Sequence, residues 1–277
     1  MLKPVLHTVI LLGTGWFALG AASCSLAKKS ASTANRSREA KHGAAAQTAA
    51  RSVPKQLVGG PRASYSSCQV PGPYLAMTFD DGPHPTNTPR LLEMLRQRNV
   101  KASFFLIGNS VDAYPNIARM ILADGHEIAN HTKTHASLSK LSDASVEREI
   151  TSCTNSIVSA TGGYRPQVFR PPYGAITTRQ KEWLLIQFGL PSIMWSVDPL
   201  DWQRPGVSVV AQRLISRAHP GAIMLAHDIH APTIEAMPQV LDTLLQRGYH
   251  FVTVSQLINL ERAGSQTLAM NFGAGNL

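Results

Sequence analysis

The sequence predicts an α/β protein whose folded part is an α/β barrel, complete or incomplete, of about seven parallel strands. Two observations lead to this fold class. From residue 74 onward, short apolar runs alternate with amphipathic stretches, which is typical of parallel strands joined by helical crossovers. Several of the apolar runs also end at charged or histidine side chains, as expected at the C-terminal rim of a barrel, where active sites are built.

The predicted elements follow one another in order along the chain. The apolar runs predicted as strands are 74–79, 103–107, 127–130, 168–170, 192–197, 222–226 and 250–253. The amphipathic stretches predicted as helices are 88–98, 115–123, 145–160, 177–188, 207–217 and 233–246, with apolar residues at helical spacing. No internal repeat is evident in the sequence.

The N-terminus has the layout of a secretory signal. Lys3 precedes an apolar stretch, 9–22, and small residues continue to Ser25, so we expect export to the periplasm, the cell envelope or the medium. Cys24 follows Ala-Ala-Ser, which resembles a lipoprotein processing site with Ala where Leu is usual. Plain cleavage and lipidation of Cys24 therefore remain alternatives. An uncleaved membrane anchor is a third, although the stretch is short and rich in glycine for a span.

The net charge of +9 is concentrated before the predicted barrel. Nine of the 26 Lys and Arg residues but only one of the 17 acidic residues lie up to Arg62, so the rest is nearly neutral. No basic helix with interleaved aromatic residues is present in the sequence, and nucleic-acid binding is not expected. The protein is expected to be a monomer.

The predicted divisions of the chain are a signal at 1–27, a disordered basic linker at 28–67, a catalytic domain at 68–262 and a flexible tail at 263–277.

Cys68 and Cys153 form an even pair in an exported protein. Either they form a disulfide that closes a long loop, or they are two buried thiols. Spacing in the sequence does not decide between these alternatives.

Adjacent carboxylates end the first predicted strand. Asp80 and Asp81 project in different directions, so one could bind a cation while the other handles a proton. His131 and His135 lie four residues apart, a common way to present two nitrogen ligands. With Asp81 as third ligand, they would leave an open position on Zn²⁺, Co²⁺ or another first-row ion.

Two further polar residues stand at strand ends. His227 follows a buried-looking run and could act as a general acid on a leaving nitrogen. Arg170 could orient a carboxylate bidentately. The other histidines without a convincing partner in the sequence are interpreted as structural or surface residues: His84, His126, His219, His230 and His250.

Five segments together resemble, in order, the motifs of the NodB-like polysaccharide deacetylases, carbohydrate esterase family four. They are Thr78-Phe79-Asp80-Asp81-Gly82-Pro83, His131-Thr132-Lys133-Thr134-His135, Arg170-Pro171-Pro172-Tyr173, Asp198-Pro199-Leu200-Asp201-Trp202 and Leu225-Ala226-His227. The resemblance covers about 74–260, and no motif residue is missing.

The resemblance implies a deformed (β/α) barrel of about seven parallel strands, the NodB homology domain. It also implies a divalent metal, Zn²⁺ first among the candidates, held by Asp81, His131 and His135. It implies that Asp80 is the general base, tethered by Arg170. His227 would be the general acid, tuned by Asp201. The remaining implied roles are oxyanion stabilisation by the backbone N–H of Tyr173 and an acetyl pocket lined by Trp202 and Leu225.

The expected activity is hydrolysis of N-acetyl groups on N-acetylglucosamine units of a polysaccharide, first of all peptidoglycan. Chitin or an exopolysaccharide is the next substrate class. Relatives that cleave O-acetyl esters of xylan or open cyclic imides define a second hypothesis, and a non-catalytic carbohydrate-binding barrel defines a third. The complete set of acid, base and metal residues argues against the third.

Overall fold

The computed structural model describes residues 62–273, with side chains up to residue 265. Its strands are β1 (Ser64–Tyr65), β2 (Tyr74–Asp80), β3 (Ser103–Leu106), β4 (Glu127–Asn130), β5 (Ser192–Ile193), β6 (Ile223–His227) and β7 (His250–Phe251). Its α-helices are α1 (Asn87–Gln97), α2 (Gly108–Ala113), α3 (Pro115–Ala123), α4 (Asp143–Thr161), α5 (Thr178–Phe188), α6 (Val207–Arg217), α7 (Ala231–Gln246) and α8 (Val254–Gly273). The six predicted helices are confirmed; α2 and α8 were not predicted.

The strand ladders within residues 62–273 are parallel, as the alternation of elements predicted, and only the isolated bridge between Ser67 and Ala222 is antiparallel there. The main sheet has the order β4-β3-β2-β6, with β7 paired to β2, while β1 pairs with β5. Isolated β-bridges connect the two sheets. Phe169 pairs with Asn130 of β4 and with Ser192 of β5, and Val197 pairs with Met224 of β6. The predicted strand at 168–170 is thus only a bridge residue. Among the described residues the ladders form an interrupted ring, which fits a deformed barrel and not a closed one.

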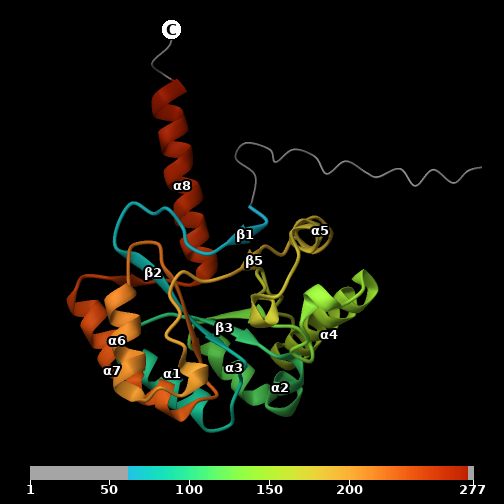
Figure 1. Cartoon of the computed structure of the whole chain (residues 1–277), viewed down its shortest axis with the longest axis horizontal. Coiled ribbons are helices and arrows are strands. Elements are labelled where there is room, and N and C mark those ends of the chain that lie inside the picture. Colours follow the sequence, from blue (N-terminus) through green and yellow to red (C-terminus); the bar gives the residue numbers. More distant parts are fainter. Residues whose placement is uncertain (1–61, 274–277) are drawn as a thin grey trace, which may run out of the picture. The chain divides into compact units, whose positions relative to one another are not determined.

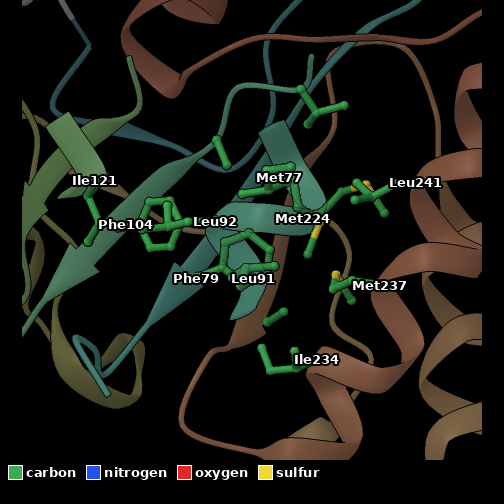
Figure 2. Packing of buried hydrophobic residues seen from close by; sticks show 14 of the residues in the cluster. Met77, Phe79, Leu91, Leu92, Phe104, Ile121, Met224, Ile234, Met237 and Leu241 are labelled. Atoms are coloured by element: carbon green, nitrogen blue, oxygen red, sulfur yellow. The ribbon is translucent and has the colours of Figure 1, made fainter. Parts of the chain in front are cut away.

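Helices α1, α2, α3, α4, α6 and α7 cover the outer face of the sheet (Figure 1), and the largest core lies between the two layers. Figure 2 shows Met77 and Phe79 of β2 and Phe104 of β3 packed against residues of α1, α3 and α7, including Leu92, Ile121 and Met237. Burial of these apolar side chains is the main force that holds the helices on the sheet.

A second cluster fills the inner side, and strand alternation decides which residues face it. On β2 the outward side chains are Leu75, Met77 and Phe79, so the inward ones are Ala76, Thr78 and Asp80. On β6 the outward side chains are Met224 and Ala226, so the inward ones are Ile223, Leu225 and His227. The register pairs Asp80 with His227. A general-base candidate and a general-acid candidate therefore stand side by side at the C-terminal ends of neighbouring strands.

Local signals end the longer helices. Ser142 caps α4 by accepting a hydrogen bond from the Ser145 N–H, and Thr177 forms a capping box with Gln180 at the start of α5. Gly162 and Gly189, both with left-handed backbone, end the same two helices.

Several boundaries differ from the predicted ones. Residues 62–67 belong to the fold and not to a linker, because β1 pairs with β5 and Arg62 forms an ion pair with Glu261. Helix α8 continues to Gly273, where a flexible tail from residue 263 was expected. The predicted signal, most of the linker and Cys24 lie outside the described residues. Within residues 62–273, no helix has both the length and the hydrophobicity needed to span a bilayer.

Cys68 and Cys153 are separate buried thiols and not a disulfide. Cys68 packs beside Gly221, whereas Cys153 lies on α4 against Gly108. Burial raises the pKa of both thiols to about 12, so both are inert structural side chains.

Candidate active site

Asp80 and Arg170 form an ion pair inside the barrel. Arg170 is fully buried and Asp80 is 3% exposed, and guanidinium Nη1 lies 2.6 Å from Asp80 Oδ1. The same nitrogen donates to Thr78 Oγ1, and the other contacts of the guanidinium are the carbonyl oxygens of Ile193 and Met194 and the ring face of Phe105. Burial lowers the pKa of Arg170, and the Asp80 charge opposes that effect. The pair places one oriented carboxylate at the rim.

Three ligand-type atoms converge beside this carboxylate. One atom from each of Asp81, His131 and His135 lies within 4.8 Å of the others. Asp81 Oδ1 is 3.3 Å from His131 Nε2 and 3.2 Å from His135 Nε2. Although burial raises the pKa of Asp81, the two imidazoles outweigh that effect and lower it.

The environment of these atoms fits a cation. His131 Nδ1 lies 2.8 Å from the carbonyl oxygen of Arg170, which requires a proton on Nδ1 and leaves a lone pair on Nε2 in the neutral ring. Asp81 Oδ1 is buried and has no hydrogen-bond partner in the described part of the chain. Lone pairs directed at one point are unfavourable unless a cation lies between them. The donor set suits a first-row divalent ion.

His227 and Asp201 form the second charged pair of the site. Asp201, in the turn Asp201–Gln203, is 2% exposed. Its carboxylate accepts from the backbone N–H of His227 and contacts ring Nδ1, both at 2.8 Å. Thr233 donates to the same carboxylate. Burial lowers the pKa of His227, but Asp201, followed by Asp80 and Asp81, outweighs burial and raises it to about 9. The contact with Asp201 therefore favours the protonated form of the His227 ring.

Left-handed backbone conformations cluster in the motif loops. Seven of the described residues other than glycine have a positive φ. Asn99 is the one that lies away from the site. The other six lie in the motif segments or in the turn after Trp202, and they are Asp81, Thr132, His135, Tyr173, Leu200 and Arg204. Such conformations cost free energy and are retained mainly where the surrounding structure imposes them. The fold thus maintains backbone strain at the positions that present the ligands and their neighbours.

The three predicted substrate-binding residues differ in exposure. Tyr173 and Trp202 are 72% and 53% exposed at the rim, and the Tyr173 hydroxyl lies 3.1 Å from His135 Nδ1. Leu225 is buried on the inner side of β6, next to His227. The rim therefore presents two exposed aromatic rings, while Leu225 is buried beside His227.

Some site neighbours were not identified from the sequence. The ring of His230, interpreted as structural or surface, lies 6.0 Å from that of His227. Glu149 of α4 accepts from the backbone N–H groups of Lys133 and Thr134, between the two histidine ligands. The spacing of His230, three residues after His227, was an available signal; the sequence carried none for Glu149.

The fold and the site define an α/β protein in which two histidines and one carboxylate that could hold a metal ion lie at the rim of a deformed barrel. A family model for polysaccharide deacetylase matches residues 68–191. A peptidoglycan-N-acetylglucosamine deacetylase of Listeria monocytogenes is 39% identical over 183 residues, which are 66% of this chain and 38% of the relative. A chitooligosaccharide deacetylase of Bradyrhizobium is 38% identical over 195 residues, which are 65% of this chain and 89% of the relative.

A solved structure gives the same result. The Bc1960 peptidoglycan N-acetylglucosamine deacetylase superposes with a TM-score of 0.67 at 32% identity, over 70% of this chain and 92% of that one. The chain belongs to the polysaccharide deacetylase family, the NodB or carbohydrate esterase four group, whose members are metal-dependent. It spans about two fifths of the length of the Listeria relative.

Proposed function

We propose that this protein removes N-acetyl groups from N-acetylglucosamine units of peptidoglycan. The observation that carries this proposal is the convergence of three parts at one rim: a metal triad, a tethered carboxylate and a cationic imidazole. Amide hydrolysis needs these three parts, because water must be activated, oxyanion charge stabilised and the leaving amine protonated. The peptidoglycan deacetylases among the relatives favour the substrate.

Each side chain has one task in this scheme. Asp80 accepts a proton from the water that attacks the acetamide carbon, and Arg170 keeps its carboxylate oriented. As the C–N bond breaks, His227 delivers its proton to the departing nitrogen, and Asp201 holds the ring in place. The Tyr173 backbone N–H donates to the oxyanion, while Trp202 and Leu225 enclose the acetyl methyl group. The products are acetate and the free amine.

A divalent ion held by Asp81, His131 and His135 would polarise the acetamide carbonyl and lower the pKa of the attacking water. We propose Zn²⁺ as this ion, with Co²⁺ or another first-row ion as alternatives, because the donor set accepts several of them. Native metal content, measured on protein purified without added metal, tests the assignment.

Acetate release from peptidoglycan and from chitin oligomers tests the activity. We expect chelator-sensitive release that is lost in His131→Ala and retained in His219→Ala, whose ring contacts Ser196 instead. Faster release from chitin oligomers would move the substrate to the chitin class. Metal-loaded protein that releases acetate from neither polymer would contradict N-deacetylation and favour an ester or cyclic-imide substrate.

We also propose that the protein is exported to the cell envelope, the compartment that contains peptidoglycan. The support is the Lys3 and 9–22 signal pattern in the sequence. Intact mass of the mature protein, compared with Cys24→Ser, separates the outcomes. A diacylglyceryl mass lost in Cys24→Ser indicates a lipoprotein, an unmodified truncated chain indicates plain cleavage, and a full-length membrane-bound chain indicates an anchor.

A further inference from the structure

Asp228, the residue after His227, is a fully buried carboxylate that the proposed reaction does not use. One oxygen, Oδ2, accepts a hydrogen bond from Thr88 of α1. The other, Oδ1, has no hydrogen-bond partner in the part of the chain that the structure describes. Buried carboxylates are costly, and most are held by several donors. A carboxylate at this position therefore calls for a role that an apolar side chain would not perform.

The carboxylate occupies the space beside Gly82. A Cβ atom built on Gly82 would lie 2.6 Å from both Asp228 oxygens, so no side chain fits at position 82 while Asp228 keeps its place. Gly82 directly follows the metal-ligand candidate Asp81, whose φ is 74°. Its carbonyl oxygen also accepts from the Ile107 N–H after β3. Gly82 is thus held from two sides.

Thr88 extends the same network to the far end of the loop. Its hydroxyl donates to Asp228 and accepts from the backbone N–H of His84 at 2.8 Å. Loop 81–84 is therefore connected through one hydroxyl to α1 and to the end of β6. Since β2 and β6 pair Asp80 with His227, this network links the loop that bears Asp81 to the strand that bears His227.

We propose that Asp228 and Thr88 are positioning residues that set the place of Asp81 relative to His227 by holding Gly82 and His84. Neither residue is assigned contact with substrate. The expected effect of Asp228 and Thr88 on metal affinity depends only on the geometry of Asp81, His131 and His135. The expected effect on turnover rests on the proposed deacetylase function.

Zn²⁺ affinity, measured by competition with a chromophoric chelator, gives the first test. Thr88→Val keeps the shape of the side chain but removes the hydroxyl, and we expect Zn²⁺ binding ~10-fold weaker, the lower end of the loss for direct partners of metal ligands, because Thr88 acts on Asp81 through Asp228 and Gly82. Thr88→Ser keeps the hydroxyl and should stay within about 3-fold of wild type. Thr86→Val is the matched control, because Thr86 directly precedes α1, is exposed, and forms no capping hydrogen bond with its side chain. Folded Thr88→Val with wild-type Zn²⁺ affinity would overturn the proposal.

A double-mutant cycle tests the contact with Gly82 even where a single variant is unstable. Gly82→Ala should weaken Zn²⁺ binding, because its Cβ displaces the carboxylate. Adding Asp228→Ala removes the clash, so the double variant should bind Zn²⁺ more tightly than additivity predicts. Strictly additive losses would contradict the proposed contact. If wild type binds Zn²⁺ but releases no acetate, the deacetylase proposal fails, and the affinities still decide the positioning role.

Discussion

Both oxygens of the Asp201 carboxylate contact His227: Oδ1 lies 2.8 Å from ring Nδ1, and Oδ2 lies 2.8 Å from the backbone nitrogen. One buried carboxylate therefore sets the position, the tautomer and the charge of the proposed general acid. The pairing joins residues 26 positions apart, and it makes the protonation of His227 depend on Asp201.

Replacing Asp201 should move the alkaline limit of activity. The His227 pKa is raised to about 9, with Asp201 the largest favourable cause, so Asp201→Asn should shift the alkaline limb of the kcat/KM profile to lower pH and reduce its plateau. Asp198→Asn is the control, since the Asp198 carboxylate contacts the backbone of Leu200 and not His227. If folded Asp201→Asn keeps the alkaline limb of the kcat/KM profile at the wild-type pH, a group other than His227 determines that limb.

The same shift predicts a pH-dependent stability of the metal-free protein. A histidine whose pKa rises from 6.5 to about 9 on folding stabilises the fold fully below about pH 6.5, and this contribution disappears as the pH rises through about 9. We expect a loss of about 3 kcal/mol in the free energy of unfolding over that range, because each pKa unit corresponds to about 1.4 kcal/mol. Urea unfolding at several pH values should show this slope in wild type and a flatter one in His227→Gln. Equal slopes in the two proteins would refute the linkage.

Arg170 should not be replaceable by lysine. Its guanidinium bonds Asp80 and two backbone carbonyls at once and lies over Phe105, a geometry that a single ammonium group does not reproduce. We expect Arg170→Lys to lower kcat ~100-fold or more, because the orientation of the general base is lost. Arg179→Lys is the control: Arg179 forms an exposed pair with Asp143, which contributes little. Near wild-type kcat in Arg170→Lys would be inconsistent with a tethering role.

Glu149 should determine metal affinity without touching the metal. It accepts from the N–H groups of Lys133 and Thr134 and from the Thr134 hydroxyl. Glu149→Ala should weaken Zn²⁺ binding ~10-fold, whereas Glu149→Gln, which keeps an acceptor oxygen, should lose less. Glu147→Ala, exposed on the same helix, should bind as wild type does. The role is excluded if folded Glu149→Ala retains full affinity.

Gly221 should be required for folding. A Cβ there would lie 1.7 Å from the Cys68 carbonyl oxygen, in a backbone with φ of 76°. We expect Gly221→Ala to destabilise the protein by about 3 kcal/mol or more. Gly189→Ala has a similar φ of 68° but nothing within 4 Å, so it should cost only about 1 kcal/mol. The difference between the two variants in the free energy of unfolding, measured with urea, gives the contribution of the clash. Equal losses of stability in both variants would argue against the clash.

Sequence reasoning was most accurate where the pattern is local. The ranges of α3, α6 and β4 agree with the predicted ones, because hydrophobic periodicity and terminating residues act within a few positions. It was least accurate where pairing is long-range. Ser64–Tyr65 becomes a strand only because β5 lies beside it, and the predicted strand at 168–170 is reduced to one bridge residue.

The sequence by itself determined the fold class, the strand ends that carry polar side chains and the residue types suited to a metal-dependent hydrolase, because these depend on local periodicity and on ordered motifs. Only the tertiary structure decided which atoms meet. Asp81 Oδ1 faces two imidazoles, Glu149 holds the backbone between them, and Asp228 fills the space beside Gly82. These contacts join residues far apart in the chain, and they follow from how parallel strands and their helices pack, which no local pattern encodes.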